Sequence, residues 1–330
     1  MSYFSGKTVL VTGATGLVGS RLVNELMAIE NVQVIALSRN EQKIKTVFIE
    51  HLKKSEFSYI AQDISEPLNL GKRVVDIIFH AASPISRDMF ITAPVSIINP
   101  NIFGTINLLE LLHKQEVESG KRGRMLLFSS MAVYGDYSDT DFVHTESDTA
   151  RAYTLNHRNA PYSEAKRLLE VIATSYVKQY NTDVVIARPS SIYGDAPIHP
   201  QTPFFEFVDL ALGGKDITIQ SSSIPRTDLI HVDDVLSGLF KIIQYGESGQ
   251  AYNLSSNGDL GNYAAVDEIA EIIASIAGVN VHYPISKAVT HAPGKKLDNS
   301  KLKSLGWEPQ IGLYDGIKRT LEIERNRMEK

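Results

Sequence analysis

Residues 9–19 of this 330-residue chain read VLVTGATGLVG, and this stretch decides the fold. A short apolar run ends at Thr12, and the glycines Gly13, Gly16 and Gly19 follow before a run with helical spacing. A glycine-rich turn between a strand and a helix brings backbone close to the pyrophosphate of a dinucleotide, which faces the helix N-terminus. The stretch therefore predicts the first strand, turn and helix of a dinucleotide-binding domain.

The alternation of short apolar runs with longer helical patterns continues through the first half of the chain. The apolar runs lie at residues 8–12, 32–37, 77–80, 125–129 and 184–187. Continuous apolar runs suit parallel strands that helices cover on both faces, joined by right-handed crossovers. We expect an α/β fold with a Rossmann-like, doubly wound parallel sheet.

This rhythm breaks after Pro189, where prolines and a glycine pair interrupt the pattern before a helix and a short strand lead back to the sheet. We predict that residues 1–190 form the NAD(P)-binding Rossmann domain and that residues 228–258 return to it. Residues 191–227 and 259–330 are predicted to form a smaller, interleaved substrate lobe, whose last part is rich in helices.

Composition narrows the class of partner. The formal charge is −5 and no dense block of Lys and Arg is present, so we expect a small-molecule partner and no nucleic acid. The absence of Cys excludes disulfides and thiolate chemistry and is typical of a reducing compartment. Residues 1–7 lack the apolar core of a secretory signal, and no apolar run approaches the roughly 20 residues that cross a bilayer. We expect a cytoplasmic protein without membrane contact.

The second strand ends at Ser38 and Arg39, where an NAD-binding site usually has an Asp or Glu for the ribose 2′-hydroxyl. Arg39, helped by the Ser38 hydroxyl, suits a 2′-phosphate instead, so the pattern favours NADP over NAD. A solvated arginine at a strand end is the alternative. Asp63 follows the third strand and is expected either near the adenine or as the cap of a turn.

Tyr162 and Lys166 are spaced one turn apart on a predicted helix. A phenol with a pKa of about 10 is a poor base near neutral pH, and a neighbouring ammonium group favours the tyrosinate. Upstream, an apolar strand ends in Ser129 and Ser130, and a serine hydroxyl there could hydrogen-bond a substrate oxygen beside Tyr162. These residues predict a site that exchanges a proton with an alcohol or a ketone.

In this order the motifs resemble the extended short-chain dehydrogenase/reductase family, especially its nucleotide-sugar epimerases, dehydratases and reductases. The resemblance covers nearly the whole chain. Its further stretches are residues 79–83 (FHAAS), 101–109 (NIFGTINLL), 127–135 (LFSSMAVYG), 161–166 (PYSEAK), 188–194 (RPSSIYG) and 226–234 (RTDLIHVDD).

The resemblance assigns a role to each matching residue. Ser130, four residues before Tyr134, becomes the catalytic hydroxyl, Tyr162 the acid/base, Lys166 its activator and ribose anchor, and Asn101 a supporting residue. Ser129 is expected to satisfy backbone only. The residues expected at the cofactor are Gly13, Thr15, Gly16, Leu17, Val18, Gly19, Ser38, Arg39, Asp63, Ile64, Ala81, Ala82, Ser83, Tyr162, Lys166, Pro189 and Ser191.

The resemblance also places the substrate at Ser130, Met131, Ser191 and Arg226. Arg226 matches a diphosphate-binding arginine of the family, with a salt bridge to Asp228 as the alternative. The chain departs from the family pattern at two other places that are expected to bind the diphosphate. Ser191 stands where the family has an asparagine, and residues 292–301 offer only lysines, such as Lys295, where the family often has another arginine.

The residues after Ser130 separate the family's reactions. Members that eliminate water carry an Asp-Glu pair there, and members that decarboxylate a uronic acid carry a Glu in the second place, whereas this chain has Met131 and Ala132. Neither side chain can move a proton. We therefore do not expect a typical dehydratase. The resemblance then implies hydride transfer at position 4 of a nucleotide sugar, by a 4-epimerase or a 4-keto-sugar reductase.

Two other functions stay open. One is an NADP-dependent reductase of a non-nucleotide ketone, and the other is a non-catalytic dinucleotide sensor, against which the catalytic residues argue. His231, Asp233 and Asp234 are expected to cap a helix, so we expect no metal. A homodimer is expected from the family. The apolar positions Ile102, Ile106, Leu109, Leu169 and Ile172 are candidate faces for it and could equally be core, because periodicity does not distinguish the two.

Overall fold

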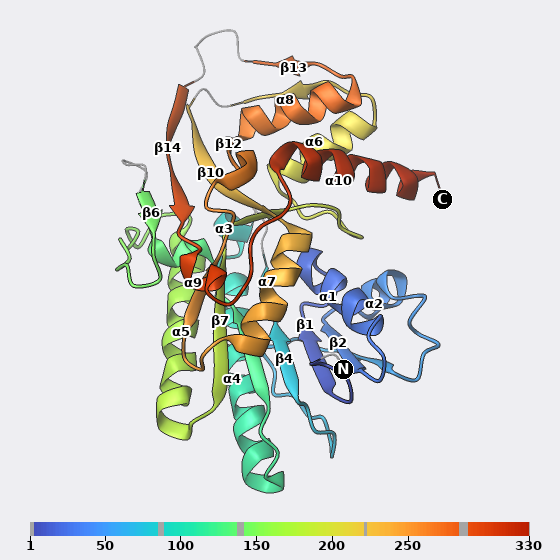
Figure 1. Cartoon of the computed structure of the whole chain (residues 1–330), viewed down its shortest axis with the longest axis vertical. Helices are drawn as coiled ribbons and strands as arrows, with labels where there is room; N and C mark the ends of the chain where they lie inside the picture. Colours follow the sequence, from blue (N-terminus) through green and yellow to red (C-terminus); the bar gives the residue numbers. More distant parts are fainter. Residues whose placement is uncertain (1–2, 85–88, 137–141, 221–222, 284–289, 330) are drawn as a thin grey trace.

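The computed structural model describes residues 3–84, 89–136, 142–220, 223–283 and 290–329 (Figure 1). Its centre is a seven-stranded sheet with the order β11-β7-β5-β4-β1-β2-β3, in which every neighbouring pair is parallel. The strands are β1 (Thr8–Thr12), β2 (Gln33–Ser38), β3 (Phe57–Ala61), β4 (Ile77–His80), β5 (Arg124–Phe128), β7 (Asp183–Pro189) and β11 (Ala251–Leu254). The predicted strands are all present, and their ends lie within two residues of the predicted ones.

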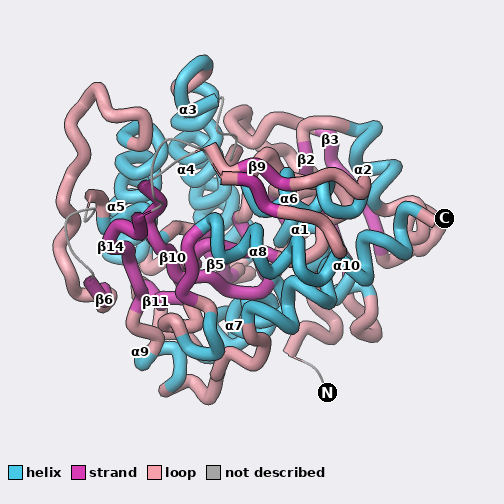
Figure 2. Tube along the Cα trace, turned by 90° about the horizontal axis from the view of Figure 1, so that it is seen from above, coloured by secondary structure: helices cyan, strands magenta, loops and turns pink. Residues whose placement is uncertain are grey.

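Helices cover both faces of this sheet, which confirms the doubly wound α/β fold. They are α1 (Leu17–Met27), α2 (Glu41–Val47), α4 (Val95–Ser119), α5 (Ala160–Tyr180) and α7 (Val232–Tyr245). In β1, Val9 and Val11 pack into a cluster with α1 and α7, whereas Leu10 packs into a second cluster with α4 and α5. Alternating side chains of a strand point to opposite faces, so each face has its own core. Figure 2 shows α4 and α5 on one side of the molecule and α1 and α2 on the other.

A second sheet lies beyond the main one and has the order β12-β10-β14-β6, with β8 paired to β10. Its strands are β6 (Phe142–His144), β8 (Ser191–Tyr193), β10 (Ser223–His231), β12 (Tyr263–Ala265) and β14 (Thr290–Leu297). Helices α6 (Pro203–Leu212), α8 (Val266–Ala277) and α10 (Leu313–Met328) share a third core, and β9 (Ile217–Thr218) pairs with β13 (Val281–His282). The short elements are α3 (Met89–Thr92), α9 (Ser300–Lys303), η1 (Met131–Tyr134) and η2 (Asp259–Gly261).

The prediction of a helix-rich tail was incomplete, because it missed β12 and β14. The β14 sequence, THAPGKKL, holds a proline and a glycine and has little β-branched character, so it gives no local strand signal. The strand forms by pairing with β10, about 70 residues earlier in the chain. At the irregular point of this pairing, a Cβ atom on Gly294 would lie 1.9 Å from the Arg226 carbonyl oxygen, so only glycine fits.

Helix α4 bears on the expectation of no membrane contact, which stays a prediction. By length and composition alone it is apolar enough to cross a membrane, with a mean hydropathy of 1.3 over its most apolar window, and it is the one such helix in the described part of the chain. Small polar residues within it had broken the apolar runs of the sequence. Its residues Leu108, Leu109 and Leu112 lie in the core against the main sheet. This packing is that of a helix that covers a sheet.

Candidate active site

The turn after β1 has no room for side chains. A Cβ atom at Gly13, whose φ is +66°, would lie 2.7 Å from the Ala81 carbonyl oxygen and 2.8 Å from the Ala82 nitrogen. A Cβ atom at Gly19 would lie 2.2 Å from the Gly13 oxygen. Gly16 begins α1 without a side-chain cap, so the first N–H groups of the helix are left for a ligand. These residues fit a dinucleotide pyrophosphate.

Polar residues at the end of β2 lie beside this turn. The Ser38 hydroxyl hydrogen-bonds the Thr15 hydroxyl at 2.9 Å. Arg39 is 56% exposed and lies 3.8 Å from an Asp63 carboxylate oxygen, a contact that contributes little in water. Asp63 also accepts the Ser65 N–H at 2.8 Å, so it caps a turn, as the alternative proposed. Arg39 is therefore free to exchange this contact for a phosphate.

The loop after β4 is held to the same turn. The Ala82 N–H donates to the Thr12 hydroxyl at 3.3 Å, and that hydroxyl lies 2.8 Å from His80 Nδ1. Burial lowers the pKa of His80 to about 3, so His80 is a neutral structural residue. Ile64 is buried in the core, and a Cβ atom on Gly104 of α4 would lie 3.0 Å from it. The Ile64 side chain thus packs against α4.

The three residues predicted to carry the chemistry come together where β5 ends and α5 begins. The Ser130 hydroxyl accepts the Ala132 N–H at 3.1 Å, and hydrogen bonding from Ser130 acts to lower the pKa of the Tyr162 phenol. Buried Lys166 donates from Nζ to the Phe128 carbonyl oxygen at 2.7 Å. The same Nζ lies 5.7 Å from the centre of the Tyr162 ring. Strand β5 therefore fixes both the serine and the lysine beside the phenol.

Burial dominates the charge state of this group. It raises the pKa of Tyr162, and the hydrogen bond with Ser130 opposes this rise. Burial lowers the pKa of Lys166 to about 7, and the Glu170 carboxylate, one turn further along α5, opposes this fall. Without ligands the phenol is therefore protonated, and Lys166 titrates near neutral pH. Activation of Tyr162 by Lys166 stays a prediction for the loaded site.

Asn101 is placed differently from these three. It is buried in α4, and its side-chain amide donates to the Ile97 carbonyl oxygen at 2.7 Å, one turn back. Pro100, the residue directly before Asn101, has no N–H and so interrupts the backbone hydrogen bonds of the helix at this point. Among the described residues, no hydrogen bond joins Asn101 to Ser130, Tyr162 or Lys166. Its observed contact supports the helix.

Two of the predicted substrate residues lie against each other. The Ser191 hydroxyl lies 3.9 Å from Met131 Sδ and hydrogen-bonds the Thr227 hydroxyl at 3.1 Å. Met131, Ser191 and Thr227 thus form one wall of the candidate site. Because Met131 directly follows Ser130, this wall lies next to the predicted catalytic serine. Thr227 was not predicted, although it neighbours Arg226 in the sequence.

Arg226 is not part of this wall. Its guanidinium donates to the Glu268 carboxylate, whose other oxygen accepts the Ala265 N–H at 2.8 Å at the start of α8. Adjacent residues of a strand face opposite ways, so when Thr227 faces Ser191, Arg226 faces α8. The alternative pairing with Asp228 is also wrong, because Asp228 is buried and accepts hydrogen bonds from Ser255, Ser256 and the Leu297 N–H.

A family model described as the NAD dependent epimerase/dehydratase family matches residues 9–255. The chain belongs to this family. UDP-glucuronic acid decarboxylase 6 of Arabidopsis thaliana is 30% identical over 318 residues, which cover 95% of this chain and 87% of that protein. Membership confirms the predicted family and a nicotinamide dinucleotide as cofactor.

Solved structures agree on the fold. The dTDP-glucose 4,6-dehydratase of Bacillus anthracis, solved with NAD, has a TM-score of 0.80 at 23% identity and covers 98% of each chain. The UDP-glucose 4-epimerase of Thermotoga maritima, solved with UDP-glucose, has a TM-score of 0.78 at 22% identity over 97% of this chain and 99% of that one. A decarboxylase, a dehydratase and an epimerase are thus all similar to this chain.

Sequence reasoning missed one aromatic residue of this epimerase/dehydratase-family site. Phe90, in α3, packs edge-to-face on Tyr162, with ring centres 5.6 Å apart and planes at 85°. The run Met89-Phe90-Ile91 is apolar although it lies in a connection between a strand and a helix, and this was the available signal. Phe90 gives the phenol an apolar neighbour and contributes to its burial.

Hydroxyl groups near the carboxyl ends of the main strands have no protein partner within the described residues. They belong to Ser83 after β4, Ser129 after β5 and Ser190 after β7. Ser83 was predicted at the cofactor. The Ser129 hydroxyl was expected to hydrogen-bond a backbone group. In the described residues it has no such partner, and only the Ser129 backbone N–H makes a bond, to the Ala187 carbonyl oxygen. Because unpartnered buried hydroxyls are costly, these groups are suited to a polar ligand.

The side chains of the remaining predicted residues make structural contacts, whereas the backbone N–H groups of Leu17 and Val18, at the uncapped start of α1, stay available to a ligand. Val18 lies in the core of α1, Leu17 packs against the same core, and Pro189 ends β7. His231 accepts the Asp233 N–H at 3.2 Å and thereby caps α7. In the described ranges, no three His, Cys, Asp or Glu side chains are arranged to hold a metal.

Proposed function

We propose that this protein transfers hydride at position 4 of a nucleotide sugar, as a 4-epimerase or a 4-keto-sugar reductase. The observation that carries the proposal is that Lys166 is buried beside the Tyr162 phenol and is held by the strand that ends at Ser130. Ser130 is followed by two residues that cannot move a proton. The names of the relatives support a nucleotide sugar, because UDP- and dTDP-sugars occur in all three.

The protein's part in the reaction is proton transfer and positioning. When bound, the nicotinamide supplies the hydride acceptor or donor. Tyr162 takes the proton from a sugar hydroxyl, or returns it to a ketone oxygen, and Ser130 hydrogen-bonds the same oxygen. Lys166 supplies positive charge next to the phenol, which favours the tyrosinate during the transfer.

Elimination and decarboxylation need a group in addition to Ser130, Tyr162 and Lys166, one that transfers a proton or binds the substrate carboxylate. At the two positions after Ser130 stand a thioether and a methyl group. The Ala132 backbone is fixed by Ser130 and by the Ser163 hydroxyl, which donates to the Ala132 oxygen at 2.6 Å. The decarboxylase name of a relative therefore does not extend to the reaction proposed for this chain.

We infer a preference for NADP from the end of β2. Arg39 is exposed, and its contact with Asp63 is long, so it can turn to a 2′-phosphate. Positions 38 and 39 hold a serine and an arginine, where an NAD-binding site usually has an acidic residue for the ribose. The family description names NAD, so binding of NAD is expected as well. The ratio of the two affinities tests this preference.

A second candidate is reduction of a non-nucleotide ketone. Arg226 was expected to bind the diphosphate of a nucleotide sugar, but it forms an ion pair with Glu268 instead, and this favours a substrate without a diphosphate. Ser191 with Thr227, rather than an asparagine, lines the corresponding wall.

We further propose a homodimer through α4 and α5. Phe103 of α4 and Leu168 and Val171 of α5 are 50%, 48% and 58% exposed, whereas the predicted face residues Leu109 and Leu169 are buried core. A single Phe103→Glu substitution should convert a dimer into a monomer in light scattering. An unchanged mass would remove α4 from the interface.

The test of the reaction is product analysis with a panel of UDP- and dTDP-sugars, supplied with NAD or with NADPH. A 4-epimer or a reduced 4-ketone, without release of CO₂ or water, supports the proposal. Turnover of simple ketones without any effect of nucleotide sugars would favour the second candidate. Native mass spectrometry of the purified protein separates the two leading reactions, because a 4-epimerase keeps its NAD.

A further inference from the structure

We propose that Arg21 is a positioning residue for the hydride transfer, because it joins the helix of the cofactor turn to the last helix of the substrate lobe. The inference rests on the proposed function, since it concerns how the cofactor and the substrate of that reaction are held relative to each other. Arg21 lies in α1, two residues after Gly19, the last glycine of the turn. Its side chain is thus attached to the helix whose first turn is expected to hold the dinucleotide.

The guanidinium group of Arg21 bridges two carboxylates that come from different elements. Its Nη1 atom lies 3.2 Å from an Asp195 oxygen, and its Nη2 atom lies 2.5 Å from an Asp233 oxygen. Asp195 comes two residues after β8, and Asp233 lies in the first turn of α7. Asp195 is 1% exposed, and a carboxylate that is removed from water needs its counterions in place. The position of the Arg21 side chain is therefore well defined.

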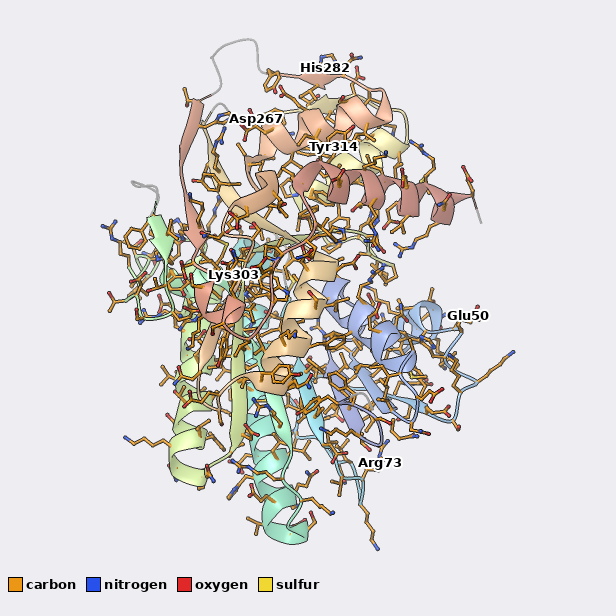
Figure 3. All side chains as sticks on the ribbon, viewed as in Figure 1. Glu50, Arg73, Asp267, His282, Lys303 and Tyr314 are labelled. Atoms are coloured by element: carbon orange, nitrogen blue, oxygen red, sulfur yellow. The ribbon has the colours of Figure 1, made fainter. Side chains whose placement is uncertain are left out.

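The same two carboxylates are bound by α10. Arg327 Nη2 lies 2.7 Å from an Asp195 oxygen, and Arg319 Nη1 lies 3.0 Å from an Asp233 oxygen. Each carboxylate thus stands between Arg21 of α1 and an arginine of α10. Figure 1 shows α10 above α1, and Figure 3 shows side chains between the ribbons of the two helices. Two ion-pair bridges therefore connect the cofactor helix with the substrate lobe.

The apolar residues of the two helices belong to different cores. Leu22 and Leu26 of α1 pack in the cluster on the main sheet, whereas Ile317 and Leu321 of α10 pack in the cluster of the substrate lobe. Lobes of one chain that keep separate cores and meet through polar contacts can shift relative to each other. Hydrogen bonds between charged groups have a defined geometry, so the bridges of Arg21 are suited to fix the separation of the two lobes.

A pair of arginine variants tests this role. In Arg21→Met, Asp195 keeps Arg327 and Asp233 keeps Arg319, so the variant is expected to fold. Arg124→Met is the matched control, because the Arg124 side chain is 19% exposed, against 20% for Arg21, and its ion pair with Asp183 lies within the main sheet. Thermal unfolding checks that both variants are folded.

Steady-state kinetics with a nucleotide sugar that the wild type converts give the first result. Reacting atoms must meet in a narrow range of positions, and a misplacement of about 1 Å can cost on the order of 100-fold in rate. We expect Arg21→Met to lower kcat about tenfold or more, while its dissociation constant for NAD changes less than about twofold. Arg124→Met should change neither value. An equal kcat in the two variants would overturn the inference.

Hydrogen exchange of the backbone amides, read by mass spectrometry, gives a second result that needs no substrate. If the wild type converts no nucleotide sugar, the proposed function fails, and this measurement decides the inference alone. We expect NAD to slow exchange in residues 313–328 of α10 in the wild type and in Arg124→Met, and this slowing to be lost in Arg21→Met. The same slowing in all three proteins, its loss in both variants, or its absence from the wild type would each overturn the inference.

Discussion

The end of β5 and the β10–β14 pair both carry residues of the candidate active site, but the two regions are stabilised in different ways. At the end of β5, Lys166 is 3% exposed and donates to the strand backbone, and Ser130 accepts the Ala132 N–H. At the β10–β14 pair, Arg226 and Thr227 lie on a strand that meets its partner only in the folded chain. The first region is a fixed group of predicted catalytic residues. In the second region, the side of the strand on which a residue lies decides whether its side chain faces the candidate site.

The largest expected effect is at the fixed group. Replacing Tyr162 by Phe removes the proton donor but keeps the ring that packs on Phe90. The turnover number should fall about a thousandfold, because acid–base catalysis contributes on the order of 10²–10⁴. Steady-state rates measure this loss, and the dissociation constant for NAD, from fluorescence titration, should stay nearly unchanged. Normal turnover in the variant would remove Tyr162 from the chemistry.

Lys166→Met should lower the rate by about a hundredfold and yet stabilise the protein near neutral pH. The folded-state pKa of Lys166 is depressed to about 7, whereas the unfolded chain holds this proton up to about pH 10. Between these values the unfolded state binds more protons, so the wild-type stability rises with pH. The advantage of the variant should therefore shrink from pH 7 to pH 10.

Urea unfolding of both proteins across this pH range measures that difference. A variant that is less stable than wild type at pH 7 would show that the ammonium group is compensated in the fold. The buried ammonium group at the end of β5 would then not lower the stability of the folded protein, contrary to this account.

A smaller effect is expected at the cofactor end of the main sheet. Arg39→Ala should weaken NADP binding about tenfold and leave NAD nearly unaffected, because a charge-assisted contact with the 2′-phosphate is lost. Titration with both cofactors measures the ratio. Equal loss for the two would mean that Arg39 does not meet the 2′-phosphate.

The smallest catalytic effect is expected from Arg226→Ala in the second region. Because Arg226 faces Glu268, kcat/KM should change by less than about threefold, and stability should fall by about 1 kcal/mol or less, as is usual for exposed ion pairs. Steady-state kinetics and thermal unfolding give the two values. An increase in KM of about tenfold or more would place Arg226 in the substrate site after all.

The same two regions explain what could be predicted from the sequence. The parallel sheet and the group of Ser130, Tyr162 and Lys166 were predictable, because strand ends and helical spacing are local properties. The second sheet was not, because β14 forms by distant pairing and has no local strand signal. The strand faces on which Arg226 and Thr227 lie follow from that pairing. The packing of Phe90 on Tyr162 depends on how the segment between β4 and α4 folds back over α5, which no local pattern predicts.

The central claim is that the site moves hydride at position 4 and does not exchange the hydrogen on the neighbouring carbon. The most direct measurement is turnover of a nucleotide sugar in D₂O, followed by NMR of the product. Our account predicts a product without deuterium at position 5, because Met131 and Ala132 cannot move a proton there. Deuterium at position 5, as elimination or decarboxylation would introduce, would contradict it.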